Sequence, residues 1–133
     1  MYGVLDISAS GLVAQRTRLN TITANIANRE AILNADGEYE PYRRKQVFFA
    51  TGNGKGDPLG VHVAAIEDDQ SDLVPRYMPG SKYADEAGYV YYPNVNSVVE
   101  QMDAMEAYRA YEANIAAAEA TKSMMTLTLQ MIA

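Results

Sequence analysis

Few side chains in this sequence could do chemistry, and the lone histidine is the first to consider. His62 lies between Val61 and Val63 in a segment with the composition of a β-strand, so the alternation of side chains turns it away from the two valines. Catalysis or metal binding by histidine needs a nucleophile, a second base or further ligands beside it. The chain has no cysteine and no second histidine. We therefore interpret His62 as a solvent-facing strand residue.

A glycine-rich segment at residues 51–56 superficially resembles a phosphate-binding loop. A Walker loop requires serine or threonine after its lysine, but Gly56 follows Lys55. A dinucleotide-binding loop requires a third glycine where Asp57 stands. The pair Asn53–Gly54 is instead typical of a tight hairpin turn, so the segment predicts the tip of a hairpin.

Three short charge runs complete the list of candidate sites. The acidic runs 67–69 and 85–86 lack the spacing of a calcium-binding loop, and we expect both to be solvated turns. The basic run 43–45 falls in a candidate strand and is expected to pair with acidic surface residues rather than with a polyanion. The sequence predicts no catalytic site, no metal site and no cofactor, and therefore not an enzyme.

Composition restricts the partners and the route of export. The chain has 133 residues and a formal net charge of -6, which disfavours binding to nucleic acid or to an anionic membrane. No apolar run reaches the roughly 18 residues of a membrane span. A charged start followed by an apolar core, which a cleaved signal peptide requires, is not seen either. If the chain works outside the cytoplasm, we expect another export route.

The elements that could position these residues predict a mainly α fold with a small β insert. Residues 4–28 have helical apolar spacing and end at the tract Asn25–Asn28. Residues 97–132 predict one long helix, which opens with a capping box formed by Ser97 and Glu100. We expect residues 1–28 and 97–133 to form one domain in which the two terminal helices pair as a coiled coil.

Residues 29–96 form the predicted central insert. They are rich in tyrosine, proline and glycine, and segments 42–50, 60–67 and 88–92 have the valine, tyrosine and phenylalanine content of strands. We expect a small antiparallel β unit with long loops.

Apolar residues at steps of three and four define the predicted interface of the terminal helices. In the first helix the stripe recurs every seven residues, and in the second it is interrupted by Lys122. The predicted assembly and coiled-coil interface consists of Leu5, Leu12, Leu19, Ile22, Ile26, Val98, Met102, Met105, Tyr108, Tyr111, Ile115, Ala118, Met125, Leu129 and Ile132.

The length and the charge of the helices favour a subunit of an assembly. A 36-residue helix is about 54 Å long, whereas a compact domain of this size has a radius of gyration of about 14 Å. Residues 123–133 carry no charge, and residues 1–15 carry only Asp6. Helix ends of this kind are suited to burial against neighbouring chains. The alternative is a monomeric helical hairpin with a neutral surface.

Several tracts resemble the flagellar basal-body rod protein family, and in particular its proximal-rod members. The opening resembles the amino-terminal signature of rod and hook proteins in segments 8–12, 18–20 and 25–28. More specific are Tyr-Arg-Arg-Lys at 42–45, Gly-Tyr-Val-Tyr-Tyr-Pro-Asn-Val-Asn at 88–96, Arg-Ala-Tyr-Glu-Ala-Asn at 109–114 and Thr-Lys-Ser-Met at 121–124. The similarity covers nearly the whole chain in the same order. Residues 29–40 and the acidic run around Asp68 depart from the pattern.

The resemblance implies a structural subunit of the hollow drive shaft that carries torque from motor to hook. It implies export by the flagellar type III apparatus and assembly in the periplasm. The implied partners are other copies of the chain, other rod proteins and the export-gate adaptor at the base of the rod. From the composition and the lack of a candidate site we expect no nucleic-acid partner, no small-molecule substrate and no direct membrane insertion. Two alternatives are a subunit of another helical secretion or filament assembly and a small binding or catalytic β domain.

Overall fold

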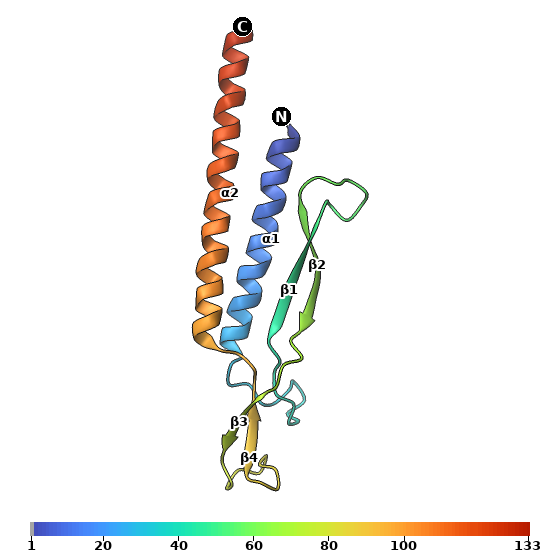
Figure 1. Cartoon of the computed structure of the whole chain (residues 1–133), viewed down its shortest axis with the longest axis vertical. Coiled ribbons are helices and arrows are strands. Elements are labelled where there is room, and N and C mark those ends of the chain that lie inside the picture. Colours follow the sequence, from blue (N-terminus) through green and yellow to red (C-terminus); the bar gives the residue numbers. More distant parts are fainter. Residues whose placement is uncertain (1) are drawn as a thin grey trace.

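The computed structural model of the protein describes residues 2–133, and its framework is a pair of long antiparallel helices (Figure 1). Helix α1 spans Tyr2–Ala27 and helix α2 spans Ser97–Ile132. A β-hairpin lies along α1, and a second small sheet lies at the pole opposite the two chain ends. The predicted mainly α class with a β insert is confirmed.

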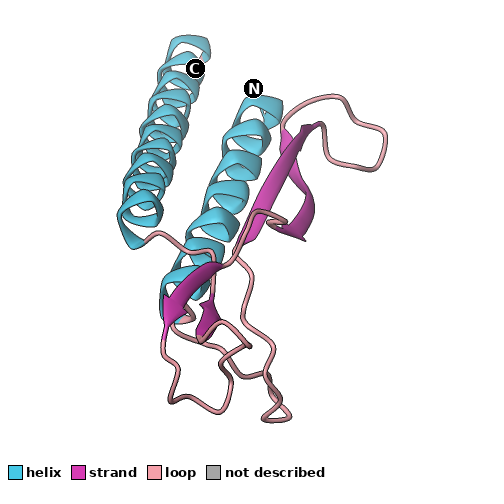
Figure 2. Cartoon of the chain, turned by 60° about the horizontal axis from the view of Figure 1, so that its bottom comes forward, coloured by secondary structure: helices cyan, strands magenta, loops and turns pink. Residues whose placement is uncertain are grey.

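Four strands form two separate two-stranded antiparallel sheets, which Figure 2 shows at different levels of the molecule. The first sheet pairs β1 with β2 and the second pairs β3 with β4. The strands are β1 (Lys45–Thr51), β2 (Val61–Asp68), β3 (Val74–Tyr77) and β4 (Tyr89–Tyr92). The expected single β unit is therefore two units, and β3 was not predicted because Pro75 and its length of four residues hide it.

The start of α2 differs from the predicted capping box. Asn96 is the N-cap, and its side-chain oxygen accepts hydrogen bonds from the amides of Val98 and Val99 at 3.0 and 3.3 Å. Glu100 turns inward and is fully buried. The physical reason is that stronger partners than the helix amides, described below, bind the Glu100 carboxylate.

The hairpin tip follows the prediction from Asn53–Gly54. Asn53 Oδ1 accepts hydrogen bonds from the amides of Lys55 and Asp57 at 2.7 and 3.1 Å. Gly52 has a φ of 82° and lies against the Asp57 carbonyl, where a side chain would not fit. These amides are used within the loop and do not form a phosphate cradle.

The molecule is open and has a small core. Its accessible surface is 9018 Å², whereas a compact protein of 14.6 kDa exposes about 6,900 Å². The buried apolar side chains in the described residues are Ala14, Ile22, Val90 and Ala107. Within residues 2–133, neither helix is both long and apolar enough to cross a membrane. Much of the apolar surface is thus left for something other than the chain itself.

The two helices meet along a seam in which small side chains alternate with larger ones. Eight of the buried and half-buried positions of α2 recur at alternating steps of four and three, and we call these eight the inner seam. They are Glu100, Ala104, Ala107, Tyr111, Asn114, Ala118, Thr121 and Met125. On α1 the contacts are made at Gly11, Arg18 and Asn25, seven residues apart. Gly11 and the alanines of the seam let the two backbones approach closely.

Gly11 is the closest of these approaches, and its enlargement is expected to destabilise the fold. A Cβ atom there would lie 2.8 Å from Asn114 Nδ2. We expect Gly11→Leu to lower the free energy of unfolding by about 1–3 kcal/mol through overpacking, measured by thermal melting of the helical circular dichroism. Gly3→Leu is the matched control, because nothing lies within 4 Å of its Cβ position. Equal melting temperatures of the two variants would contradict the close packing.

Candidate functional site

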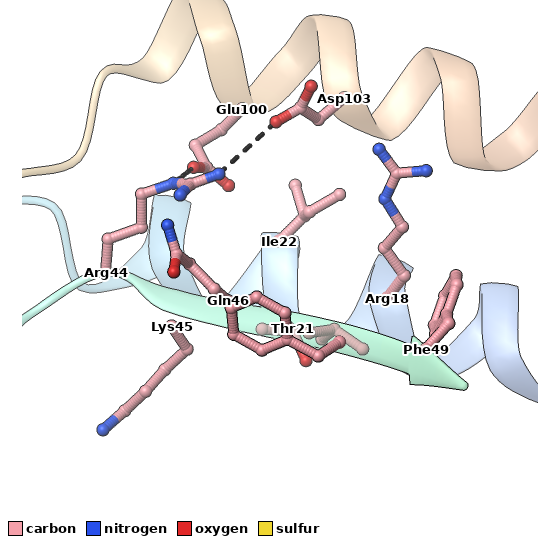
Figure 3. Close-up of a pocket in the computed structure, with 11 residues that line it drawn as sticks. Arg18, Thr21, Ile22, Arg44, Lys45, Gln46, Phe49, Glu100 and Asp103 are labelled. Carbon is pink, nitrogen blue, oxygen red and sulfur yellow. Dashed lines mark hydrogen bonds and ion pairs between the residues drawn. The ribbon is translucent and has the colours of Figure 1, made fainter. Parts of the chain in front are cut away.

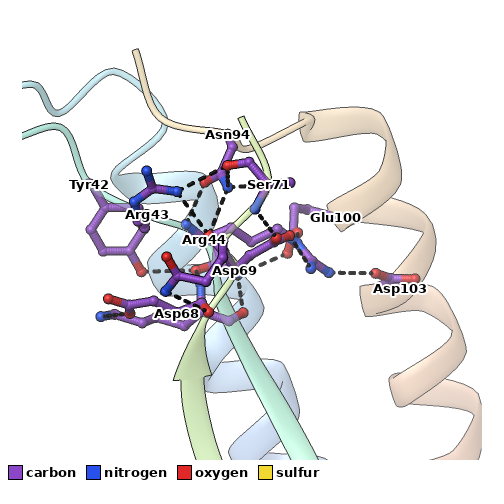
Figure 4. Close-up of polar contacts among 12 residues, drawn as sticks. Tyr42, Arg43, Arg44, Asp68, Asp69, Ser71, Asn94, Glu100 and Asp103 are labelled. Carbon is purple, nitrogen blue, oxygen red and sulfur yellow. Dashed lines mark hydrogen bonds and ion pairs between the residues drawn. The ribbon is translucent and has the colours of Figure 1, made fainter. Parts of the chain in front are cut away.

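A cluster of polar side chains joined by hydrogen bonds and ion pairs lies at the foot of the two helices (Figure 4). We call it the polar hub, and its members come from α1, from the start of β1 and the segment before it, from the end of β2 and the loop after it, and from the start of α2 and the segment before it. They are Asn25, Tyr42, Arg43, Arg44, Lys45, Asp68, Asp69, Ser71, Asn94, Glu100 and Asp103. The hub is where segments distant in sequence are joined.

Asn25 binds the start of β1 as a neighbouring strand would. Its Nδ2 donates to the Lys45 carbonyl at 3.0 Å, and its Oδ1 accepts from the Lys45 amide at 2.9 Å. The Tyr42 hydroxyl also donates to Oδ1, at 2.8 Å. Burial raises the pKa of Tyr42, so the hydroxyl stays protonated as a donor. Asn25, predicted only as a helix terminator, thus anchors the insert to α1.

Arg44 is the cation of the hub. It forms an ion pair with Glu100 Oε1 through Nε and contacts Asp69 at 3.4 Å and Asp103 at 3.5 Å. Burial alone would lower the pKa of Arg44, but the hydrogen bond and charge of Glu100 and the charges of Asp69 and Asp103 outweigh it and raise the pKa. The buried Glu100 carboxylate also accepts from Asn25 Nδ2 at 3.3 Å. A buried charge of this kind is tolerated only when it is paired in this way.

Asp68 and Asp69 of the acidic run 67–69 belong to the hub, whereas Glu67 is exposed in β2, so the run is not the solvated turn that we expected. Asp68 forms an ion pair with Lys45 across the hairpin. Asp69 Oδ1 accepts from the Ser71 amide at 2.9 Å, and this bond, with a smaller contribution from Arg44, lowers the pKa of Asp69. The expectation that run 43–45 pairs with acidic residues is confirmed for Arg44 and Lys45.

Acid is expected to weaken the fold through the hub. Because the pKa of Asp69 is lowered on folding, its stabilisation is complete above the ordinary carboxyl pKa of about 4 and is lost as the pH falls through the folded pKa. We expect the urea midpoint to fall between about pH 5 and pH 3. In Asp69→Asn the loss over this range should be smaller. An identical pH profile in both chains would contradict the assignment.

A groove of about 360 Å³ opens beside the hub, between α1, α2 and β1 (Figure 3). Ile22 lies at its floor, Arg18 and Asp103 face it from the two helices, and Gln46 and Phe49 face it from β1. Two charged side chains that line the groove already form ion pairs, since Arg18 pairs with Glu106 at 3.7 Å and Asp103 pairs with Arg44. The lining contains no nucleophile next to a base, so the groove suits packing rather than chemistry.

The remaining candidate chemical residues have structural partners. Nδ1 of His62 lies 2.8 Å from the Gly52 carbonyl oxygen, and His62 is half-buried rather than solvent-facing. This contact therefore joins the start of β2 to the residue that follows β1, at the base of the hairpin loop. No group of three or more possible metal ligands is found in the part of the chain that the structure describes.

The predicted interface residues fall into two sets. Ile22 is buried, and the remaining predicted positions of α1, together with three of α2, are half-buried. These half-buried residues are Leu5, Leu12, Leu19, Ile26, Tyr111, Ala118 and Met125. The other predicted positions of α2 are exposed and lie outside the inner seam: Val98, Met102, Met105, Tyr108, Ile115, Leu129 and Ile132.

The geometry of a helix explains this division. Each residue turns the helix by about 100°, so residues two apart point to nearly opposite sides. Val98 and Met102 lie two positions from the buried Glu100, and each is 65% exposed. The residues of the predicted stripe therefore lie on the outer face at the start of α2, and further along the helix some of them lie in the inner seam.

The end of α2 carries apolar side chains that the rest of the chain leaves uncovered. Because Gly11 lies beside Asn114 and Asn25 beside Glu100, the start of α1 falls near residue 123. The last nine or so residues of α2 therefore extend about 13 Å past α1, as Figure 1 shows. We call residues 124–132 the overhang. Its exposed apolar side chains are Met124, Leu127, Leu129, Met131 and Ile132.

Comparison with known proteins gives consistent matches at both helices and along the whole chain. Residues 5–29 match a family described as flagella basal body rod protein, and residues 86–131 match one described as flagellar basal body rod FlgEFG protein C-terminal. The chain is 41% identical to the flagellar basal-body rod protein FlgC of Salmonella typhimurium, over 97% of this chain and 96% of that protein. It is 36% identical to FlgC of Bacillus subtilis, over 95% and 94% of the two chains, and 36% identical to FlgC of Borreliella burgdorferi, over 99% and 97%.

Proposed function

This chain belongs to the FlgC-like branch of the flagellar basal-body rod protein family and is a structural subunit of the rod, and from this membership we propose that it assembles helically in the proximal rod. In this proposal the rod is a hollow shaft that transmits torque. The observation that carries the proposal is the mismatch between the small buried core and the large uncovered apolar surface of α2.

The proposed architecture assigns different tasks to two parts of the chain. Residues 1–28 and 97–133 form a coiled-coil domain that builds the wall of the shaft, and residues 29–96 form an insert carried at its foot. The seven-residue spacing of the inner seam supports the coiled coil, since this period keeps two helices in contact along their length. The polar hub supports a fixed attachment of the insert.

The predicted interface residues divide into two roles under this proposal. The buried and half-buried set packs α1 on α2 within one chain. The exposed set, which runs from Val98 on the outer face of α2 to Ile132 in the overhang, contacts neighbouring subunits. Large exposed apolar patches of this kind mark interaction surfaces, and methionine adapts its shape to neighbours that are not identical.

The proposed partners are further copies of this chain, other rod proteins and the export-gate adaptor at the base of the rod. The proposed location is the periplasmic part of the basal body, reached through the flagellar type III apparatus. The exposed apolar ends favour assembly with other proteins, and the net charge of -6 gives no support to a nucleic-acid partner.

Mass spectrometry of purified hook–basal bodies from the source cells tests the proposal. We expect the chain to be present in a fixed ratio to the other rod proteins, after a high-salt wash that removes loosely bound proteins. Absence from intact basal bodies would overturn the placement in the rod, and the subunit of another helical secretion or filament assembly would become the better interpretation.

A further inference from the structure

The loop between β1 and β2 (Figure 1) holds a pair of residues whose chemistry the proposed function does not use. In Asn53–Gly54 the backbone amide of the glycine can attack the side-chain carbonyl carbon of the asparagine and close a five-membered succinimide ring. Glycine favours this closure because it has no side chain to obstruct it. Both residues are exposed, and no other asparagine in the sequence is followed by glycine. This pair is therefore where the sequence most readily allows the reaction.

The hydrogen bonds of the Asn53 side chain are of the kind that would promote the attack. Its Oδ1 accepts from the amides of Lys55 and Asp57 at 2.7 and 3.1 Å. When the carbonyl carbon is attacked, negative charge develops on this oxygen. Backbone amides at these distances are the groups that stabilise an oxyanion in enzymes. The turn that orders the loop therefore also polarises the carbonyl of the Asn53 side chain.

The Gly54 amide, which would be the nucleophile, is not engaged by the turn. Within residues 2–133 its N–H donates no hydrogen bond to another protein atom. The amides on either side of it are bonded, since that of Asn53 donates to the Asp57 carbonyl at 3.0 Å and that of Lys55 donates to Asn53 Oδ1. The attack therefore breaks no hydrogen bond that the Gly54 N–H donates within the protein.

His62 places a base beside this amide. Its Nδ1 lies 2.8 Å from the Gly52 carbonyl oxygen, which only accepts, so Nδ1 carries a proton. In the neutral imidazole the lone pair is then on Nε2. Nε2 lies 3.3 Å from the position that a Cβ atom of Gly54 would occupy. The contact that holds the ring at the base of the loop thus also turns its basic nitrogen toward Gly54.

We propose that the folded hairpin tip promotes deamidation of Asn53, with His62 as the general base. His62 Nε2 takes the proton of the Gly54 amide as the amide nitrogen bonds to Asn53 Cγ. The bond between Cγ and Nδ2 then breaks, and the same proton passes to Nδ2, which leaves as ammonia. Water adds to one of the two carbonyl carbons of the succinimide and opens the ring to aspartate or isoaspartate. The reaction oxidises and reduces nothing.

The two products differ in how well they preserve the tip. Aspartate keeps an oxygen where Asn53 Oδ1 stood, so it still accepts from the amides of Lys55 and Asp57. Isoaspartate adds a methylene group to the main chain and displaces these amides. Each product adds one negative charge to a chain whose formal net charge is -6. The reaction is a property of the single chain, so its failure would leave the proposed function untouched.

Incubation of the purified full-length chain at neutral pH in water labelled with ¹⁸O tests the proposal. Each deamidation takes one oxygen atom from the labelled water, so mass spectrometry separates it from deamidation during a later digestion in ordinary water. The reference is the same chain unfolded in guanidinium chloride. We expect Asn53 to react about tenfold faster, or more, in the folded chain, because the two amides and the base are assembled only there. Equal rates, or a faster reaction in the unfolded chain, would overturn the proposal.

His62→Gln removes the base and keeps its structural contact. Glutamine can still donate to the Gly52 carbonyl but has no basic nitrogen. We expect deamidation of Asn53 in the folded chain to slow by about tenfold or more, while the rate in the unfolded chain stays the same. An unchanged rate in the folded chain would rule out His62 as the base.

A second turn of the same chain provides a matched control that leaves the hairpin tip unaltered. Asn34 Oδ1 also accepts from two backbone amides, those of Asp36 and Glu38, at 2.9 and 3.0 Å. The side-chain nitrogen of Asn34 additionally donates to Glu40 at 3.0 Å. The double variant Ala35→Gly with Glu40→Ala therefore gives Asn34 a following glycine and a free leaving group in an equivalent turn.

Both asparagines of this double variant are measured in one digest. Only Asn53 has a histidine beside it, because the chain contains one histidine. We expect Asn53 to deamidate about tenfold faster than Asn34. Equal rates at the two positions would mean that the turn and the glycine are sufficient, and would overturn the role of His62 with no change made at the hairpin tip.

Discussion

Replacing Arg44 with methionine is expected to lower the free energy of unfolding by about 3 kcal/mol or more. Methionine fills a similar volume but leaves the Glu100 carboxylate, which is fully buried, without its cation. Domains of this size are stable by only about 5–15 kcal/mol, and this chain has a small apolar core to compensate. Urea unfolding followed by helical circular dichroism measures the loss.

The double variant Arg44→Met with Glu100→Met is the control that assigns this loss to the buried charge. When both partners of a buried ion pair are replaced by apolar residues, stability is often unchanged or higher. We therefore expect the double variant to recover most of the stability that the single variant loses. A double variant that is as unstable as Arg44→Met would show that Arg44 acts through Asp69 and Asp103 instead.

Leu129→Asp is expected to abolish incorporation into the rod while leaving the isolated chain folded. Leu129 is 67% exposed in the overhang, past the start of α1, so the charge remains in water until a neighbouring subunit covers it. Burying an unpaired carboxylate in an apolar contact costs several kcal/mol. Immunoblotting of purified hook–basal bodies measures incorporation, and thermal melting of the purified chain measures folding.

Leu129→Met is the matched control, since it keeps an apolar side chain of similar size. We expect it to incorporate and to support motility. Normal rods built from Leu129→Asp would show that the overhang faces solvent in the assembly. A lower melting temperature of the isolated Leu129→Asp chain would show that α2 contacts its own chain at this position.

The terminal helices could be predicted because their evidence is local. The apolar spacing of residues 4–28 and the uninterrupted segment 97–132 predicted α1 and α2 to within two residues at each end. The stripe on α2 was less informative. Steps of three and four do not separate the inner face from the outer face when both carry apolar residues, and Met102 and Met105 are as apolar as any residue in the seam.

The polar hub could not be predicted because its bonds join residues that are distant in sequence. Asn25 was interpreted as a helix terminator, Glu100 as part of a cap and Asp69 as part of a solvated turn. Each interpretation follows a local rule, whereas Asn25 and Glu100 are 75 residues apart. A signal was present in the high polarity of the short tract 42–45, which carries three cations at the start of a strand.

The small side chains between α1 and α2 bear on how the assembled structure deforms. Long side chains between helices let the helices shift relative to one another, because each side chain has several rotatable bonds. Where alanine and glycine lie between the helices, few rotatable side chains are present, and the two helices resist sliding past each other. We therefore expect each subunit to be rigid and the contacts between subunits, which involve the methionine-rich outer surface of α2, to deform more easily. Twist applied to one end of the shaft would then be taken up mainly at the joints between chains.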